Sequence, residues 1–365
     1  MLVHVCCSVD SHYFLSELKK KYPDEKMIAF FYNPNIHPKE EYDMRLLDVK
    51  RSCKILGVDL IEGQYDLVSW LDRTYGFEDE EEKGERCSIC FDERLLKTAI
   101  LAMQLNENKV STTLLASPMK SKEELFSQGD KIIEKYGLDF IKIDVRSNGG
   151  TQAQSKMAKE TNLYRQNYCG CLYALNKQRT RSNKVSIELF NDIGGQILHG
   201  SPKHTIDSFM EFYRLESQNI PCLLQKNSLE IHRILNAKVK HEGIVIPSYI
   251  FTHSKSCKNL KSNAITWVKR KIEGNLVELG YCDNMQFITI ESINLMLNKN
   301  YKNVLMMLYN PPNYASELEL RSKILGMESI KPFIILDSKP MGGITLNIES
   351  ISQVADVFEV IKFEL

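Results

Sequence analysis

Residues 1–38 read MLVHVCCSVDSHYFLSELKKKYPDEKMIAFFYNPNIHP, in which two apolar segments flank a helical pattern. Short apolar runs bounded by turn residues are typical of buried strands, and apolar residues three and four positions apart are typical of a helix. The stretch predicts a strand over Leu2–Cys7, a helix over Ser11–Tyr22 capped by Asp10 or Ser11, and a strand over Met27–Tyr32. A strand, a helix and a second strand in this order form the unit of a parallel sheet.

The same alternation continues to about residue 145. Proline suits the first turn of a helix, so Pro38 is expected to open the next one. The further predicted elements are helices over Pro38–Leu56, Arg86–Leu105 and Ser121–Tyr136, and strands over Val58–Glu62, Lys109–Ala116 and Asp139–Val145. The pattern predicts a parallel sheet with helices on both faces, in which ligands bind beyond the carboxyl ends of the strands. Cys6, Cys7 and the segment 112–118 are expected at that edge.

From about residue 183 the pattern changes, and we expect a second domain of the α+β class. The predicted elements are helices over His204–Gln218 and Ser228–Val239, and strands within Gly243–Phe251, Phe333–Leu336 and Gly343–Ile348. The expected domains are therefore residues 1–182, which carry the motifs discussed below, and an accessory domain of unknown function over residues 183–365.

Composition excludes several classes of protein. The chain has 365 residues, 43% of them hydrophobic and 26% charged, with 47 basic residues balancing 47 acidic ones. No apolar run approaches the roughly 18–20 residues that span a bilayer, and the first residues do not have the pattern of a secretory signal. A membrane protein, a secreted disulfide scaffold and a disordered chain are therefore excluded, and the cytoplasm is the expected location.

Ten cysteines carry most of the chemical information. Six of them form three close pairs within the first 171 residues: Cys6 and Cys7, Cys87 and Cys90, and Cys169 and Cys171. In a reducing compartment such pairs favour metal binding or redox chemistry over structural bridges. Thiolates select iron–sulfur clusters, zinc or Cu(I). Six thiolates exceed what one zinc ion needs, and a cluster takes up to four, which leaves two for a second metal or a redox dithiol.

Asp10 follows Cys7 by three residues and is expected either to cap the helix or to face the same edge of the sheet. The next strand is followed by YNPNIHP at 32–38, which presents Tyr32, Asn33 and His37 at that edge. Thr113 and Ser117 are expected there as well, and all five side chains are candidates for binding the substrate.

Charge is uneven along the chain. Residues 156–184 contain seven basic side chains and the single acid Glu160, interleaved with Tyr164, Tyr168 and Tyr173. A second acid-free stretch, residues 253–271, is also basic; the alternative for each stretch is a solvated helix face. Basic side chains beside aromatic ones can neutralise phosphates and stack unpaired bases. Together with the thiols, they indicate an enzyme that acts on RNA, whereas the acidic run at 78–82 is expected to be a solvated loop.

Residues 1–180 resemble the QueH-type epoxyqueuosine reductases. The motifs that carry the resemblance are HVCC at 4–7, FYNPNIHP at 31–38 with Glu41, Tyr42 and Arg45, RCSIC at 86–90 with Arg94 and Leu95, TTLL at 112–115 with Ser117 and Pro118, and YRQNYCGC at 164–171. The resemblance implies a Rossmann-like sheet of the HUP or PP-loop type. It also implies reduction of epoxyqueuosine to queuosine at the wobble position of tRNA, with two electrons and two protons. Residues 183–365 match no family by these motifs.

The resemblance further implies a [4Fe–4S] cluster and an additional mononuclear iron. Carried over by position, the cluster or metal ligands are Cys6, Cys7, Cys87 and Cys90. Cys169 and Cys171 are then either a redox-active pair or ligands of the second iron, for which Asp10 is a natural partner. Residue type makes Arg86, Arg165 and Lys177 candidates for binding phosphates, and Tyr32 or Tyr168 for stacking the base. The expected partners are tRNA carrying epoxyqueuosine and an unidentified electron donor.

Two other functions are compatible with the residues. An ATP-dependent tRNA thiolation enzyme needs a glycine-rich phosphate loop after the first strand, but residues 6–10 read CCSVD and contain no glycine. A zinc-stabilised RNA-binding module without catalysis would contain zinc and no inorganic sulfide.

Overall fold

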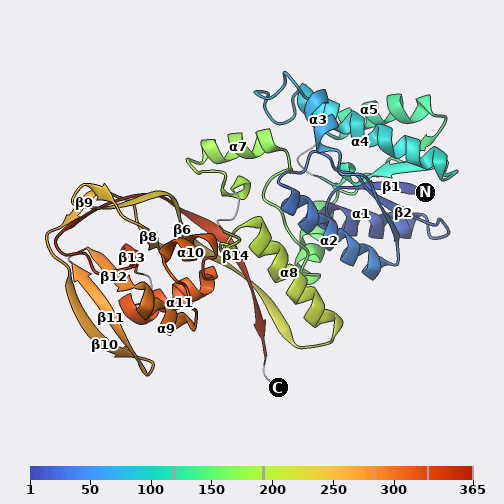
Figure 1. Cartoon of the computed structure of the whole chain (residues 1–365). Coiled ribbons are helices and arrows are strands. Elements are labelled where there is room, and N and C mark those ends of the chain that lie inside the picture. Colours follow the sequence, from blue (N-terminus) through green and yellow to red (C-terminus); the bar gives the residue numbers. More distant parts are fainter. Residues whose placement is uncertain (118–120, 191–193, 283, 327–328, 364–365) are drawn as a thin grey trace. The chain divides into compact units, whose positions relative to one another are not determined.

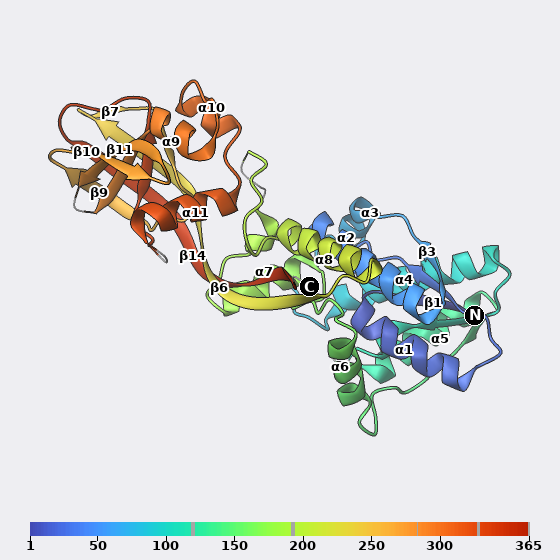
Figure 2. The same ribbon diagram turned by 90° about the horizontal axis from the view of Figure 1, so that it is seen from below.

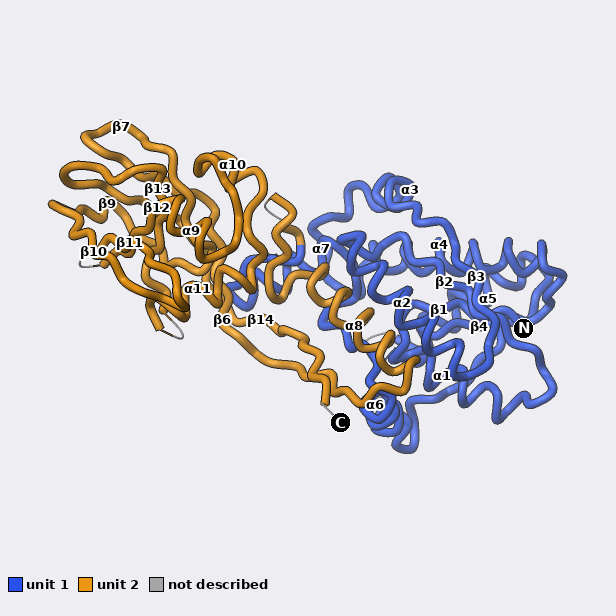
Figure 3. The backbone as a smooth tube through the Cα atoms, turned by 60° about the horizontal axis from the view of Figure 1, so that its bottom comes forward, with its two compact units in different colours: residues 1–188 blue, residues 189–365 orange. Residues whose placement is uncertain are grey.

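The computed structural model describes residues 1–117, 121–190, 194–282, 284–326 and 329–363; Pro118, part of one quoted motif, lies outside them. The chain divides into two compact units, residues 1–188 and 189–365 (Figure 3). None of the helices in the described ranges is long and apolar enough to cross a membrane. The functions expected for the two parts of the chain stay predictions.

Unit 1 is built on a five-stranded sheet with the order β3-β2-β1-β4-β5, in which every neighbouring pair is parallel (Figure 1). The strands are β1 (Leu2–Val5), β2 (Ile28–Phe31), β3 (Asp59–Glu62), β4 (Lys109–Thr112) and β5 (Asp139–Phe140). The helices are α1 (Ser8–Lys21), α2 (Lys39–Leu56), α3 (Leu67–Arg73), α4 (Glu85–Gln104), α5 (Lys122–Lys135), α6 (Gly150–Glu160) and α7 (Leu172–Arg181), with short 3₁₀ turns at Thr113–Leu115 (η1) and Ile187–Leu189 (η2).

Strand β1 lies at the centre of this sheet and is buried throughout. Leu2 belongs to an apolar cluster with Phe30 on one face, whereas Val3 and Val5 pack with Phe14 on the other. Successive side chains of a strand point to opposite faces. A strand covered by helices on both sides is therefore apolar, except where a polar side chain has a hydrogen-bond partner inside the protein. The strand order reverses around β1, which makes its carboxyl end the expected ligand site of an open α/β sheet.

The predicted α/β class with a parallel sheet is confirmed, and the differences in unit 1 concern element ends. Helix α1 begins at Ser8 with Cys7 as its N-cap, so Asp10 lies in the first turn and is not the cap. The strand expected over Lys109–Ala116 ends at Thr112 and continues as η1. The strand expected over 139–145 has only two residues, and helices α3, α6 and α7 were not predicted.

Unit 2 contains two further sheets. One has the order β10-β11-β12-β13-β8 and is antiparallel except between β12 and β13; the other has the order β7-β6-β14-β9 and is antiparallel. The strands are β6 (Cys222–His241), β7 (Ile244–Val245), β8 (Ser248–Ile250), β9 (Cys257–Ser262), β10 (Thr266–Ile272), β11 (Asn275–Cys282), β12 (Met285–Thr289), β13 (Phe333–Leu336) and β14 (Ile344–Lys362). The helices are α8 (Pro202–Ser217), α9 (Ile290–Leu297), α10 (Val304–Tyr309) and α11 (Tyr314–Leu325).

The helix expected over Ser228–Val239 is wrong, because these residues belong to the long strand β6. β6 and β14 run side by side over almost their whole lengths (Figure 2). The register shifts where Asn236 pairs with Glu349 and Ile234 with Ser350, which leaves Leu235 as an extra residue in β6. A bulge of this kind interrupts the alternation of a strand, and it gives apolar residues the spacing of a helix.

The basic stretch 253–271 also differs from its helical alternative. Lys258 and Lys261 lie on β9, and Lys269 and Lys271 lie on β10, all four of them exposed. The cations are therefore presented by strands.

Candidate active site

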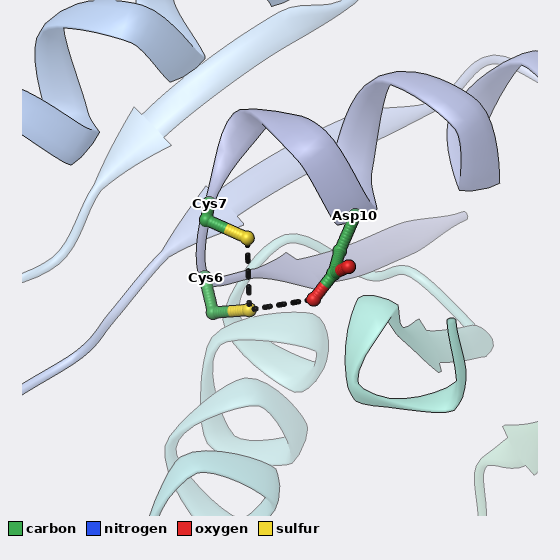
Figure 4. A group of neighbouring side chains, drawn as sticks. All are labelled: Cys6, Cys7 and Asp10. Atoms are coloured by element: carbon green, nitrogen blue, oxygen red, sulfur yellow. Dashed lines mark hydrogen bonds between the residues drawn. The ribbon is translucent and has the colours of Figure 1, made fainter. Parts of the chain in front are cut away.

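The carboxyl end of β1 carries the first group of candidate ligands. The Sγ atom of Cys6 lies 3.9 Å from that of Cys7 and 4.0 Å from Oδ2 of Asp10. The three side chains point toward one another, those of Cys6 and Cys7 from the turn between β1 and α1 and that of Asp10 from the first turn of α1 (Figure 4). Their ligand atoms lie within 4.8 Å of each other, so this group could hold a metal ion.

The electrostatics of this group favour one thiolate. The contact between the two thiols lowers the pKa of Cys6 and raises that of Cys7, because the Cys6 thiolate is stabilised by the hydrogen of Cys7, which is then harder to remove. Burial raises the pKa of Asp10, and its Oδ1 accepts a hydrogen bond of 2.6 Å from Nε2 of Gln154 on α6. A bound cation would offset the cost of placing these charges in the interior.

A small cavity of about 70 Å³ collects five of the six paired cysteines. It is lined by Cys6, Cys87, Cys90, Cys169 and Cys171, together with Asp10. Cys7 is not among the residues that line it, but its sulfur contacts that of Cys6. The sulfur of Cys90 accepts a hydrogen bond of 2.9 Å from Nη2 of Arg94, and the sulfur of Cys169 accepts one of 3.4 Å from the amide of Cys171. The three pairs, separated by up to 165 positions in the chain, thus meet at one place.

Arg45 on α2 fixes the segment that carries Cys169. Its guanidinium donates to the carbonyl oxygens of Tyr168 (3.0 Å) and Cys169 (3.1 Å) and pairs with Glu41 through Nε (2.7 Å). The guanidinium and the Glu41 carboxylate are both buried, so each charge has its partner inside the protein. Arg45 was quoted for the resemblance, but its role in holding this segment was not anticipated.

A second, larger pocket of about 330 Å³ adjoins the thiol-lined cavity. The two share Asp10, Ser117, Gln166 and Cys169. The remaining wall of the pocket is mostly polar and consists of Val9, Glu82, Thr151, Gln154, Ser155, Arg165, Asn167, Tyr168 and Gln178. Hydroxyls and amides offer both donors and acceptors, which is the composition of a pocket for a polar organic ligand. Sequence reasoning missed most of these residues, because single amides on α6 and α7 have no distinctive pattern.

Several predicted substrate residues lie at these two cavities. Asn33 lines the small cavity, Arg165 and Tyr168 line the larger pocket, and Ser117 lines both. Thr113 is buried beside them, with Oγ1 3.7 Å from the sulfur of Cys6.

Other predicted substrate residues are placed differently. Tyr32 is buried in an apolar cluster, where it stacks on Phe30 and donates to Glu93 (3.2 Å). His37 lines neither cavity and interacts through its backbone, by accepting from Tyr168 (2.6 Å) and donating to Gly170 (2.9 Å).

Arg86 is only 1% exposed, so its burial is incompatible with the phosphate contact expected from its residue type. Two cations of α7 have partners in the acidic run at 78–82: Lys177 contacts the carbonyl of Asp79, and both Lys177 and Arg181 pair with Glu81. The third, Arg179, pairs with Glu188. That run therefore neutralises part of the basic patch instead of facing only solvent.

The chain is an α/β protein with a parallel sheet, and the thiols and Asp10 at the carboxyl end of β1 form a group that could hold a metal ion. Comparison with known proteins agrees with this class. The family model for epoxyqueuosine reductase QueH matches residues 1–177. A relative from Helicobacter pylori named epoxyqueuosine reductase QueH is 38% identical over 98% of this chain and 99% of its own length. The chain belongs to the QueH family of epoxyqueuosine reductases, and it is therefore an oxidoreductase.

Two other similarities differ in extent. A relative of the same name from Thermotoga maritima is 33% identical and matches 51% of this chain but 95% of its own length. A solved structure of the U34-tRNA thiolase NcsA from Methanococcus maripaludis with its [4Fe–4S] cluster is 14% identical, with a TM-score of 0.33, and covers 47% of this chain and 61% of that one. The second similarity is too low to support an argument about this chain.

Proposed function

We propose that this chain reduces the epoxide of epoxyqueuosine at the wobble position of tRNA, which gives queuosine and water. The observation that supports this best is the junction of the two cavities in unit 1. A small cavity lined by thiols adjoins a larger polar pocket, and Asp10, Ser117, Gln166 and Cys169 belong to both walls. Two electrons and two protons must reach the epoxide, so the redox group and the nucleoside have to meet at a shared wall.

The donor set fits the metals implied by the family. Thiolates are the ligands of iron–sulfur clusters, and besides Cys6 the small cavity is lined by four of them, from Cys87, Cys90, Cys169 and Cys171. Cys6, Cys7 and Asp10 form a separate group that would hold one iron ion. This allocation moves Cys6 and Cys7 from the cluster to the ion, because their sulfurs lie close to the Asp10 carboxylate. When bound, the cluster supplies electrons one at a time and the ion polarises an oxygen atom.

The larger pocket is the place where we expect the modified nucleoside. Its volume of about 330 Å³ lies within the usual range for small-ligand sites. Gln154 is held by its hydrogen bond to Asp10, and Oε1 of Gln166 is buried with no hydrogen-bond partner among the described residues. These amides would bind hydroxyl groups and base edges of a nucleoside. Arg165 is the candidate for a phosphate, and Tyr168 for a contact with the base; Tyr32 is left out because it is buried elsewhere.

The proposed reaction also requires a macromolecular substrate and a source of electrons. We propose tRNA as the macromolecular substrate and a separate electron donor that delivers single electrons. The cytoplasm is the proposed location, because all ten cysteines are free thiols and a reducing compartment preserves them.

The first experiment measures iron, acid-labile sulfide and zinc in anaerobically purified full-length protein. We expect about five irons and four sulfides per chain, as for one [4Fe–4S] cluster and one ion. Cys87→Ala and Cys169→Ala are expected to lose most of the sulfide, whereas Cys222→Ala, in unit 2, serves as the matched control and keeps it. Loaded protein with a chemical reductant should then convert epoxyqueuosine to queuosine in tRNA, followed by mass spectrometry of the nucleosides.

Zinc without sulfide, after anaerobic handling and attempted reconstitution, would contradict the reductase and favour a zinc-stabilised RNA-binding module. Four irons with four sulfides and normal turnover would instead contradict the separate iron ion and keep the cluster.

A further inference from the structure

Two arginines on helix α4 enter the thiol-lined cavity. Arg86, Cys90 and Arg94 are four positions apart, so they share one face of the helix. Arg86 is 1% exposed and Arg94 is 6% exposed, and both line the small cavity together with Cys87 and Cys90. Two fixed positive charges are thus buried against thiols.

The hydrogen bonds of these arginines are incomplete. Nη2 of Arg94 donates to the sulfur of Cys90 at 2.9 Å, and its Nε has no partner among the described residues. Nη1 of Arg86 donates to the carbonyl oxygens of Phe77 (2.7 Å) and Glu78 (3.0 Å). Nε and Nη2 of Arg86 are buried with no hydrogen-bond partner in the described part of the chain.

Buried charges and buried donors need partners inside the protein. Within the described ranges, neither arginine has a carboxylate within ion-pair distance, although pairs are found for Arg45 and Arg73 in the same unit. The guanidinium of Arg86 also lies over the ring of Tyr173, 5.4 Å from its centroid. Both arginines belong to the wall of the cavity, which thiols line together with Asp10. An anionic, sulfur-rich group in that cavity would provide both the missing acceptors and the missing negative charge.

We propose that Arg86 and Arg94 are positioning residues that hydrogen-bond to the sulfur atoms of the cluster site and raise the reduction potential of the group bound there. The inference rests on the proposed function for the identity of that group. A [4Fe–4S] core with four thiolates carries two negative charges when oxidised and three when reduced, so adjacent positive charges stabilise the reduced form more. Net charge, hydrogen bonds to sulfur and solvent exposure are the properties by which a protein sets such a potential.

The test is an EPR-monitored redox titration of the reconstituted full-length protein and of Arg86→Gln and Arg94→Gln. We expect each variant to lower the ratio of reduced to oxidised cluster at a fixed potential by about tenfold, which corresponds to about 59 mV for one electron. Arg94→Lys keeps the charge but loses the planar array of donors, so its shift should be smaller and of the same sign. Arg181→Gln, which removes an exposed charge from unit 1, is the matched control and should leave the potential unchanged.

Unchanged potentials in both glutamine variants, at full iron and sulfide content, would overturn the inference and leave the proposed function intact. Wild-type protein without iron and sulfide would instead overturn the proposed cofactor. Loss of cluster from a variant whose circular dichroism and melting temperature match those of the wild-type apoprotein supports the role in holding the group. If a glutamine variant does not fold, the titration of the corresponding lysine variant decides: a negative shift supports the inference and no shift overturns it.

Discussion

Gly170 separates two candidate ligands and has a conformation that other residues rarely adopt. Its φ is +104°, and a Cβ atom at this position would lie 2.8 Å from Cγ1 of Ile36 and 3.2 Å from Nη1 of Arg45. Its carbonyl oxygen also accepts the hydrogen bond of the His37 amide. The backbone at 169–171 is therefore held from two sides, and glycine is what allows both cysteines to face the cavity.

Gly170→Ala is expected to destabilise the protein by about 1–3 kcal/mol, because it combines an unfavourable φ with a close contact. Metal content should fall with it, since the change moves Cys169 and Cys171. Thermal unfolding of the apoprotein and iron analysis of the reconstituted protein check the two parts separately.

Gly137→Ala is the matched control: Gly137 also has a positive φ, +67°, but its Cβ would meet nothing within 4 Å. Equal losses of metal in the two variants would show that the close contact at Gly170 has no specific role.

Asp10 occupies the wall between the two cavities and contacts both a thiol and an amide. Asp10→Asn keeps the size of the side chain but removes the charge. We expect it to lose about one iron per chain while keeping the sulfide, because the cluster thiols lie on other segments. Ser11→Ala, also buried in the first turn of α1, controls for local packing. If Asp10→Asn keeps the full iron content and the full rate, Asp10 is not an iron ligand, and its role is limited to the hydrogen bond with Gln154.

At the scale of elements, His4 links three strands of the central sheet. Its Nε2 lies 3.0 Å from the carbonyl oxygen of Tyr32, after β2, and its Nδ1 lies 3.0 Å from Oγ1 of Thr112, at the end of β4. The carbonyl can only accept, so Nε2 carries the hydrogen and Nδ1 accepts from the Thr112 hydroxyl. Burial, with the nearby Arg94 charge, lowers the pKa of His4 from 6.5 to about 3.

This shift predicts how stability depends on pH. Between pH 6.5 and 3 the unfolded chain binds a proton at His4 that the folded protein does not, so stability falls as pH falls through this range. The slope from this group is at most about 1.4 kcal/mol per pH unit. Denaturant unfolding of the apoprotein at pH 7 and pH 5 should show a smaller loss for His4→Gln than for the wild type.

The other buried histidines serve as the reference, because their contributions are the same in both proteins. A pH dependence that is identical in His4→Gln and in the wild type would contradict the assignment of His4 as a neutral link between strands.

The elements that could be predicted from the sequence are those whose burial is local and regular. The strands of unit 1 are short apolar runs, and Pro38 and Ser121 stand at the helix starts that their residue types favour. Strand β6 was missed because its structure depends on pairing with β14, more than a hundred residues later, and on the bulge at Leu235. The cysteines could be identified because they occur in pairs, whereas Gln154 and Gln166 acquire their meaning only where α6 and the 164–171 segment meet the edge of the sheet.

At the scale of the whole chain, the similar proteins differ in whether they contain a counterpart of unit 2. The family model covers residues 1–177, within unit 1, and the Thermotoga maritima relative is almost fully covered by about half of this chain. The Helicobacter pylori relative is covered along 99% of its length by 98% of this chain, so it has a counterpart of unit 2 as well. The two cavities that hold the candidate ligands belong to unit 1, whereas the pocket of about 460 Å³ in unit 2 is lined by only one of the ten cysteines, Cys282. Unit 2 is therefore expected to change how a substrate is bound more than the reaction itself.

The exposed cations of β9 and β10 are the feature of unit 2 that suits tRNA. We expect the triple variant Lys258→Gln, Lys261→Gln and Lys269→Gln to bind tRNA more weakly at 150 mM salt. The slope of log K against log salt should become smaller by about 2, since each lost phosphate contact contributes about 0.7. Iron content and turnover at saturating tRNA should not change, because the metal ligands lie in unit 1. Lys299→Gln with Lys302→Gln, which removes exposed charges elsewhere in unit 2, provides the control. If the triple variant and the control bind tRNA with the same affinity and the same salt dependence as the wild type, these strands do not contact the nucleic acid.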